Sequence, residues 1–148
     1  MNLIMKKQNT EITKLFKQKQ KTCAQLLQTM EEQMRAVSNQ DDSQLARIIE
    51  GKEELIAVLN ETDQIIIERV GALDEANLEL LARDSEELRL RIETDLEKII
   101  QQEMDCQEKL HLEKSEVVEK IKGLRKGQKL LKGYERSQRI KPKISKNV

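Results

Sequence analysis

The spacing of the apolar residues near the start of the chain is the feature that most constrains its fold. Phe16, Cys23, Met30 and Val37 recur every seven residues, and a second apolar row is offset from them by four. Positions a and d of a coiled coil have this spacing, and good helix formers fill the positions between them. The spacing predicts a helix over residues 10–38 that buries one narrow apolar face against other helices.

The composition argues against most other fold classes. Of the 148 residues, 36% are charged and 1% are aromatic, and the two aromatic side chains are Phe16 and Tyr134. Aromatic and β-branched residues favour sheets, and aromatic residues line deep pockets, so this chain is poorly suited to either. We therefore expect an all-α protein whose core is a narrow seam of Leu, Ile, Val and Met between helices.

A second helix is predicted to follow the first after a short turn. The sequence SNQDDS at residues 38–43 is rich in side chains that favour turns and helix N-caps. The second helix should therefore begin near Asp41 or Asp42 and run to residue 70. Gly51 lies inside this helix, and we expect it to be tolerated on the outer face rather than to permit a close contact. Gly71 is the expected C-cap.

The third predicted helix is the longest and covers residues 85–132. Asp84 followed by Glu87 resembles a capping box at its start. One heptad row of this helix is formed by Leu96, Leu110, Val117, Leu124 and Leu131. Three glycines weaken its end, and residues 136–148 are expected to form a disordered basic tail.

Charge is distributed unevenly along the chain, although the net charge is zero. Residues 1–22 carry six Lys and one Glu, residues 23–110 carry nine basic and 22 acidic side chains, and residues 111–148 carry twelve basic and four acidic ones. Basic ends beside an acidic centre suggest antiparallel packing, or a tail that binds an acidic partner. We expect one domain over residues 1–135: an elongated three-helix antiparallel bundle, or coiled-coil hairpin, with a long C-terminal helix.

Signals for membranes, metals and catalysis are weak. The longest purely apolar run, residues 55–59, is far too short to span a bilayer, and the start of the chain lacks the apolar core of a signal peptide. Cys23 and Cys106 have no metal-binding spacing. We expect them to be reduced, buried thiols, with a disulfide or redox role as the alternative. His111 is the single histidine, and we expect no enzyme, no cofactor and no metal ion.

Binding functions remain. The basic C-terminal region would allow electrostatic binding to nucleic acid or to a membrane surface, but the acidic body and the lack of aromatic platforms argue against both. These lysines can equally serve to solvate the end of a helix. We therefore expect neither nucleic-acid binding nor membrane insertion. A helical body that presents an apolar face to helices of other proteins fits the sequence better.

Residues 36–66, AVSNQDDSQLARIIEGKEELIAVLNETDQII, resemble the helical hairpin of bacterial flagellar export chaperones of the FlgN/FliT type. The features that carry the resemblance are an acidic turn, apolar positions every three or four residues and a Lys-Glu pair: Asp41, Asp42, Leu45, Ile48, Ile49, Lys52, Glu53, Leu55, Ile56 and Leu59. The last stretch, IKGLRKGQKLLKGYERS, is similar to the C-terminal ends of the FlgN branch. The resemblance covers residues 10–135, and the three glycines near its end depart from the family pattern.

The resemblance implies a cytoplasmic, non-enzymatic chaperone. Proteins of this type bind the C-terminal helical segment of a secreted flagellar subunit, such as a hook–filament junction or filament-cap protein. They prevent its premature assembly and deliver it to the export gate. The expected cargo surface is the apolar face formed by Val117, Val118, Ile121, Leu124 and Leu131. The alternatives are that this face packs on the first helix or pairs in a homodimer.

Tyr134 is the candidate for docking on the export gate, because an aromatic residue near the C-terminal tail has this role in the family. Its alternative role is a side chain that packs back on Leu130 or Leu131 at the end of the helix. A function of a different class also fits the sequence, namely a structural coiled-coil subunit that is stalk-like or associated with a secretion ATPase. Such a stalk would be an antiparallel two-helix rod with continuous heptads.

Overall fold

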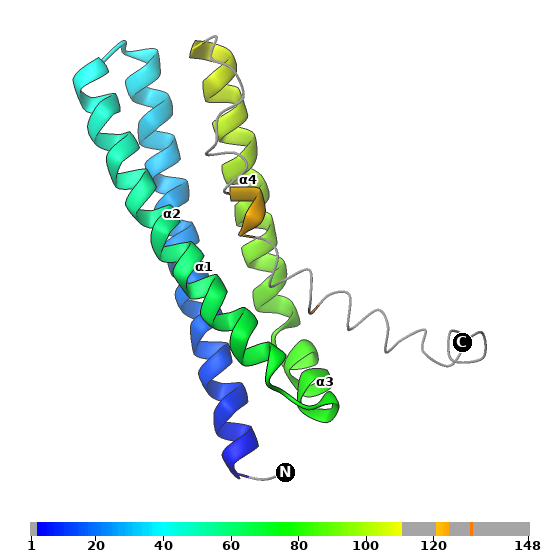
Figure 1. Ribbon diagram of the computed structural model, residues 1–148. Helices are drawn as coiled ribbons and strands as arrows, with labels where there is room; N and C mark the ends of the chain where they lie inside the picture. Colours follow the sequence, from blue (N-terminus) through cyan, green and yellow to red (C-terminus); the bar gives the residue numbers. More distant parts are fainter. Residues whose placement is uncertain (1–2, 111–120, 125–130, 132–148) are drawn as a thin grey trace.

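The computed structural model describes residues 3–110, 121–124 and 131 of the chain (Figure 1). Its helices are α1 (Leu3–Ser38), α2 (Asp42–Gly71), α3 (Glu75–Asp84) and α4 (Glu86–Leu110). The described residues contain no β-strand. The predicted all-α helical bundle is therefore confirmed, although α1 begins at Leu3 rather than at residue 10.

The longest helix, α1, lies at the centre of the bundle. Figure 1 shows α2 running back along α1, and α4 running along α1 in the same direction as α1 itself. α1 packs extensively against both of these helices, whereas α2 and α4 share few contacts with each other. The short α3 links the far end of α2 to the start of α4. Two sides of α1 are therefore covered by long helices.

The buried side chains of α1 follow the predicted heptad spacing. The residues of this heptad pattern are at most 8% exposed and comprise Ile12, Phe16, Lys19, Cys23, Leu26, Met30, Gln33 and Val37; Thr22 and Ala36, next to this pattern, are buried as well. Burial of the apolar members removes their surface from water, which stabilises the bundle by about 25 cal/mol for each Å² buried. Lys19 and Gln33 are the exceptions to the expected apolar seam.

The turn between α1 and α2 forms where the sequence SNQDDS predicts it. Gln40 has a positive φ of 54°, and its N–H donates to the carbonyl of Val37 (3.2 Å). The N–H of Asp41 donates to the carbonyl of Ala36 (3.0 Å). These are the two hydrogen bonds of a Schellman motif, which ends α1. Asp41 is then the N-cap of α2, because its carboxylate accepts a hydrogen bond from the N–H of Gln44 (3.1 Å).

The prediction for the end of α2 is wrong by one residue. Gly71 is the last residue of α2, and the C-cap is Ala72, which has a right-handed backbone conformation. Among the described residues no glycine has a positive φ. α2 ends through tighter hydrogen bonds instead, from the N–H of Ala72 to the carbonyl of Arg69 (3.3 Å) and from the N–H of Leu73 to the carbonyl of Val70 (3.1 Å).

The sequence does not predict the short helix α3, because the loosened apolar spacing of residues 71–84 resembles a connection. Asp74 is its N-cap, and the Asp74 carboxylate accepts hydrogen bonds from the backbone N–H (2.8 Å) and the side-chain amide (2.9 Å) of Asn77. Leu81 anchors the helix in the core. Asp84 is the last residue of α3, so its predicted role as the cap of the next helix is wrong.

The helices α3 and α4 are joined by a slight break at Ser85. The N–H of Ser85 donates to the carbonyl of Leu81 (2.9 Å), and the carbonyl of Ser85 accepts from the N–H of Arg89 (2.9 Å). The ψ of Ser85 is 0°, which departs from helical values. The buried guanidinium of Arg89 covers the end of α3, since it donates to the carbonyl of Ala82 (2.6 Å) and to the Ser85 hydroxyl (3.1 Å).

The predicted single helix over residues 85–132 is wrong. The Gln33 side chain of α1 donates to Cys106 Sγ of α4 (3.1 Å), whereas the carbonyl of Leu124 lies 2.7 Å from Nζ of Lys19. On α1, Lys19 lies roughly 21 Å before Gln33. α4 runs parallel to α1, so a straight continuation of α4 would place Leu124 roughly 27 Å beyond Cys106, in the direction away from Lys19. α4 and Leu124 are therefore not parts of one straight helix.

Gly51→Ala is expected to stabilise the protein by about 1 kcal/mol, because alanine is the better helix former. A Cβ at Gly51 would have no heavy atom within 4 Å, which confirms the expected tolerance. Urea unfolding followed by far-ultraviolet circular dichroism measures the change. Gly71→Ala is the control, because it also meets open space but lies at the last residue of α2, and it should change stability less. A loss of stability in Gly51→Ala would contradict the open surroundings.

Candidate functional site

The candidate functional site is the place where residues 121–124 and 131 meet the bundle. Ile121, Leu124 and Leu131 are at most 1% exposed and belong to the same buried cluster as apolar side chains of α1, α2 and α4. Figure 1 shows residues 121–124 as a short orange segment. We call the part of α1 and α2 at this place the C-terminal seat and define it by one helical turn of each: Phe16, Lys19, Asp63 and Ile66.

Lys19 makes the polar contacts of the C-terminal seat. Its Nζ lies 2.7 Å from Oδ1 of Asp63 and donates a second hydrogen bond of 2.7 Å to the carbonyl of Leu124. The Lys19 side chain is fully buried, and that of Asp63 is 3% exposed. Residues 121–123 are helical and Leu124 ends the turn. The ammonium group therefore meets a carbonyl at the C-terminal end of a helical turn, where carbonyls lack helical partners and cations are favoured.

A second buried lysine, Lys52 of α2, joins the three long helices at another level of the bundle. Its Nζ lies 2.7 Å from Oε2 of Glu103 on α4 and donates to Oε1 of Gln33 on α1, also at 2.7 Å. The Gln33 amide in turn donates to Cys106 Sγ (3.1 Å). All four residues are at most 5% exposed. A charge is buried at acceptable cost only when it is paired and hydrogen-bonded, and both conditions hold here.

We call the Lys19–Asp63 pair and the Lys52–Glu103 pair, with their hydrogen-bond partners, the two polar layers of the bundle. The sequence contains a signal for these layers, although the expected seam was apolar. Lys19 follows Phe16 by three residues and precedes Cys23 by four, so it occupies a heptad core position. Lys52 and Glu103 are likewise buried beside the buried apolar residues of α2 and α4. Charged side chains are rarely fully buried, which is why an apolar seam is the ordinary expectation. That expectation is wrong at these positions.

The structure describes only part of the predicted binding residues. Ile121, Leu124 and Leu131 are buried, so the expected cargo face is not exposed at these three positions. The hydrogen bond from Lys19 to Leu124 agrees with the alternative that this face packs on α1. Val117, Val118, Tyr134 and His111 lie outside the described residues.

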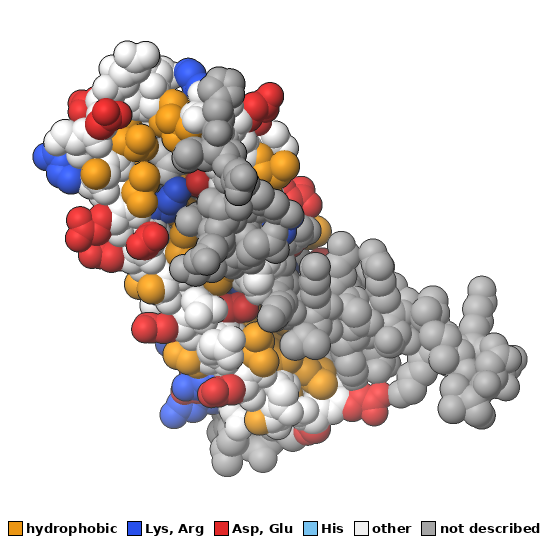
Figure 2. Space-filling model, turned by 45° about the horizontal axis from the view of Figure 1, so that its top comes forward, with side chains coloured by type: hydrophobic (Ala, Val, Ile, Leu, Met, Phe, Trp, Pro, Cys, Tyr) orange, Lys and Arg blue, Asp and Glu red, His pale blue; other side chains and the backbone are white. Residues whose placement is uncertain are grey.

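Exposed apolar side chains are dispersed over the described surface. On the face shown in Figure 2 they lie in several groups between acidic and basic side chains. The large ones are 38–57% exposed and comprise Ile49, Val58, Ile65, Leu90 and Met104. Single exposed apolar residues are common on proteins and do not by themselves indicate a partner.

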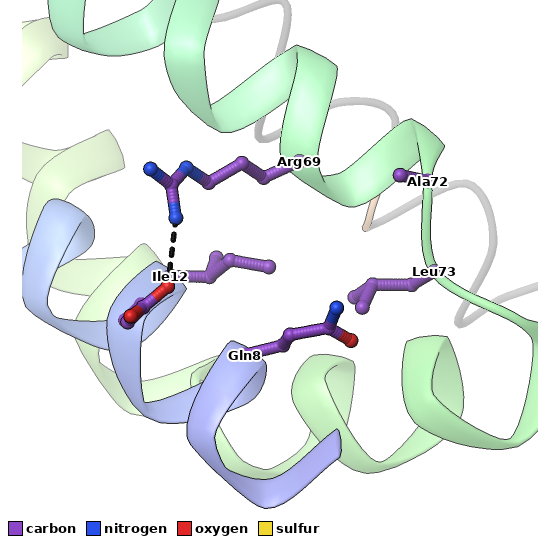
Figure 3. A pocket seen from close by; sticks show the side chains of 6 residues that line it. Gln8, Ile12, Arg69, Ala72 and Leu73 are labelled. Carbon is purple, nitrogen blue, oxygen red and sulfur yellow. Dashed lines mark hydrogen bonds and ion pairs between the residues drawn. The ribbon is translucent and has the colours of Figure 1, made fainter. Parts of the chain in front are cut away.

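A small pocket lies between the start of α1 and the end of α2 (Figure 3). It has a volume of about 150 Å³ and is lined by Gln8, Glu11, Ile12, Arg69, Ala72 and Leu73. At its edge Nη1 of Arg69 lies 2.8 Å from Oε2 of Glu11, and these side chains are 50% and 42% exposed. Pockets for small molecules commonly measure roughly 300–1,000 Å³. We therefore assign no ligand to this one.

Cys23 is expected to resist alkylation in the folded protein. Burial raises the pKa of its thiol from 9.0 to about 12, and Lys19 lowers it by less. Because the thiolate is the reactive form, the reactive fraction near pH 8 should be about 1000-fold smaller than in the unfolded chain. Iodoacetamide labelling with and without urea, followed by mass spectrometry, measures this difference.

The same pKa shift predicts a dependence of stability on pH. Between pH 9.0 and about 12 the thiol of Cys23 ionises in the unfolded chain but not in the folded one, so stability should decrease as the pH rises above 9. Cys23→Ala should lose this part of the pH dependence. For the labelling experiment, rapid reaction of Cys23 with iodoacetamide in the folded protein would contradict the burial of its thiol.

Metal and membrane signals are also absent from the part of the chain that the structure describes. No three His, Cys, Asp or Glu side chains there gather in a group that could hold a metal ion. None of the described helices combines the length and the apolar character needed to cross a membrane. Comparisons of the chain with protein-family models, with curated proteins and with solved structures gave no match.

Proposed function

We propose that the chain is a cytoplasmic export chaperone that holds the C-terminal helical segment of a secreted flagellar subunit. The subunit would be a hook–filament junction or filament-cap protein, which the chaperone keeps from premature assembly and delivers to the export gate. The resemblance of residues 36–66 to flagellar export chaperones supports this proposal. The all-α bundle agrees with it, because a helical body is the scaffold that such a function needs.

The observation that carries the proposal is the way the C-terminal seat holds residues 121–124 and 131. Ile121, Leu124 and Leu131 are buried in the apolar cluster of the bundle, and Lys19 of the C-terminal seat binds the carbonyl of Leu124 at the end of the helical turn. Amphipathic helices that bind in grooves of other proteins use the same combination of apolar anchors and a few polar contacts. A helix of a partner protein with this chemistry would find the same contacts by taking the place of residues 121–131.

The cargo surface proposed from the structure therefore differs from the one expected from the sequence. The sequence places it on the apolar face that contains Ile121, Leu124 and Leu131. Because these side chains are already buried, we assign cargo binding to the surface that they cover, which includes Phe16 and Lys19 of α1. The two assignments make opposite predictions for the same variant.

The test is a titration of dye-labelled C-terminal segments of a hook–filament junction protein and a filament-cap protein with the full chain, read by fluorescence anisotropy. In the double variant Ile121→Glu and Leu124→Glu, residues 121–131 no longer compete for the C-terminal seat. We expect this variant to bind the segment at least about tenfold more tightly than the unmodified chain, because a larger fraction of the protein is competent to bind. Circular dichroism verifies that the helices remain.

The outcomes separate the assignments. Weaker binding by the double variant would show that the cargo binds the face of residues 121–131 itself. No binding of either segment, by the unmodified chain or by the variant, would contradict the chaperone function. A segment in which the apolar positions are replaced by serine is the control for non-specific binding, and it should not bind.

Tyr134 remains the candidate for contact with the export gate. Tyr134→Ala should reduce secretion of the cargo in cells without changing the affinity for the cargo segment, because the two contacts use different parts of the chain. Secretion assays together with the anisotropy titration measure the two effects. Loss of both activities, or of neither, would contradict this role.

The stalk-like alternative agrees less well with the described fold. It requires an antiparallel two-helix rod with continuous heptads. The described helices instead include three long ones that pack with α1 in the centre, and the chain is interrupted at residues 39–41, at residues 72–74 and at Ser85. A hydrodynamic radius as large as that of an extended rod would favour the stalk.

A further inference from the structure

The carbonyl of Leu124 is the polar group that residues 121–124 present to the C-terminal seat. Residues 121–123 are helical, and the N–H of Leu124 donates to the carbonyl of Ile121 (3.1 Å), which closes the turn. Carbonyls at the C-terminal end of a helix carry a partial negative charge. Nζ of the fully buried Lys19 donates to the Leu124 carbonyl (2.7 Å). The seat therefore binds the end of a helical turn through its backbone.

The side chains of this turn divide into two that the bundle buries and two that it does not. Ile121 and Leu124 are at most 1% exposed, and their spacing of three residues places them on the same side of the turn. Lys122 is exposed, and a Cβ at Gly123 would have no heavy atom within 4 Å. The seat thus specifies two apolar positions and the carbonyl of the second, and it leaves the two residues between them unconstrained.

The charge of the seat is balanced without any contribution from its occupant. Oδ1 of Asp63 lies 2.7 Å from Nζ of Lys19, and the Asp63 side chain is 3% exposed. The carbonyl oxygen of Leu124 lies 2.7 Å from the same nitrogen, so it is close to the Asp63 carboxylate. A neutral carbonyl adds no charge there. A carboxylate in its place would bring a second negative charge to one buried ammonium, and two like charges at close range in a protein interior repel each other.

We propose that the Lys19–Asp63 pair makes the C-terminal seat selective for a helix that ends inside a chain, and that it excludes a helix that ends at a free C-terminus. The first presents a neutral carbonyl, whereas the second presents an α-carboxylate. This inference rests on the proposed function, because it requires that the seat admits a helix of another protein. It specifies the cargo further: the bound helix ends before the last residue of the secreted subunit.

Asp63 is the residue that sets this preference. An ammonium without a partner favours a carboxylate over a carbonyl, because a hydrogen bond between two ions is stronger than one to a neutral acceptor. Since Asp63 already pairs with Lys19, the preference is for the carbonyl. Asparagine at this position retains an acceptor oxygen for Lys19 but has no charge. Asp63→Asn is therefore expected to reverse the preference.

The test uses two forms of one dye-labelled probe, a helical peptide of alanine and glutamine that ends in the sequence of residues 121–124, Ile-Lys-Gly-Leu. One form ends in a carboxamide, which presents a neutral carbonyl, and the other ends in a carboxylate. The double variant Ile121→Gln and Leu124→Gln of the full chain opens the seat without adding charge. Fluorescence anisotropy near neutral pH measures both affinities. We expect the carboxamide form to bind at least about tenfold more tightly.

Two further variants of the opened chain identify the cause of this difference. Asp63→Asn should make the carboxylate form the tighter ligand. Glu103→Gln is the matched control, because it makes the same change in the polar layer of Lys52, and the carboxamide form should remain preferred. The same two peptides are used throughout, so a difference in their own helicity cannot reverse the order. Circular dichroism verifies that each variant is folded, and the comparison in the opened chain remains decisive if Asp63→Asn is not.

Each outcome bears on one of the two proposals. Equal affinities of the two forms for the opened chain, tighter binding of the carboxylate form, or no binding of either form would overturn the selectivity of the seat. A preference for the carboxamide that persists in Asp63→Asn would overturn the role of Asp63. Failure of the proposed function gives a different result, in which the probe binds with the expected preference but neither flagellar cargo segment binds.

Discussion

Glu103→Leu is expected to lower the free energy of unfolding by about 3–5 kcal/mol. The substitution leaves the ammonium of Lys52, which is 2% exposed, in the core without its carboxylate partner. Leucine fills a similar volume, so the loss arises mainly from the unpaired buried charge. Gln33 still accepts a hydrogen bond from Lys52, but an amide does not neutralise a charge. Urea unfolding followed by circular dichroism measures the loss.

Compensating and matched variants separate this effect from a loss of packing. Lys52→Met combined with Glu103→Leu should recover most of the stability, because no charge is then buried. Arg69→Ala is the matched control, because the Arg69–Glu11 pair is nearly as short (2.8 Å) but about half exposed. It should cost about 0–1 kcal/mol. Equal losses of unfolding free energy in Glu103→Leu and Arg69→Ala would contradict the burial of the Lys52–Glu103 pair.

Lys19→Met is expected to lower the free energy of unfolding by about 3–5 kcal/mol as well. It should also release residues 121–131 from the C-terminal seat. Asp63 is left buried without its cation, and the carbonyl of Leu124 is left without its donor. Methionine keeps most of the volume of the lysine stem, so the effect is mainly polar. Urea unfolding measures the stability, and hydrogen exchange of the amides of residues 121–131 measures the release.

Two controls isolate the contact between Lys19 and Leu124. Lys19→Met combined with Asp63→Leu removes the unpaired charge, so stability should recover while the amides of residues 121–131 still exchange faster. Lys52→Met also breaks a buried ion pair, but it lies in the other polar layer and should not accelerate exchange in residues 121–131 selectively. Unchanged exchange of these residues in Lys19→Met would show that Lys19 does not anchor them.

The sequence predicts the first two helices well, because their signals are local. The heptad row through Phe16, Cys23 and Met30 defines the buried face of α1, and the turn residues before Asp42 define where α2 begins. The end of the chain is different. The row through Leu110, Val117 and Leu124 has the same spacing whether the chain continues straight or turns back, so periodicity alone cannot distinguish the two arrangements.

The polar contacts of the site depend on distant parts of the sequence. Lys19 meets Asp63 across 44 residues, and Lys52 meets Glu103 across 51 residues. Their heptad positions indicate that these side chains face the core, but the sequence does not specify which carboxylate pairs with which lysine. The helix α3 also depends on distant residues. Its N-cap at Asp74 is a local signal, but its short apolar face is recognisable as a helix face only when it packs against the longer helices.

Hydrogen exchange of the full chain, with and without a saturating C-terminal segment of a hook–filament junction protein, is the most direct test of the proposed function. We expect residues 121–131 to exchange faster when the segment binds, because the segment takes their place. The part of α1 around Phe16 and Lys19 should keep or gain protection. Unchanged exchange in both regions at saturating segment would contradict the proposal that the C-terminal seat binds the cargo.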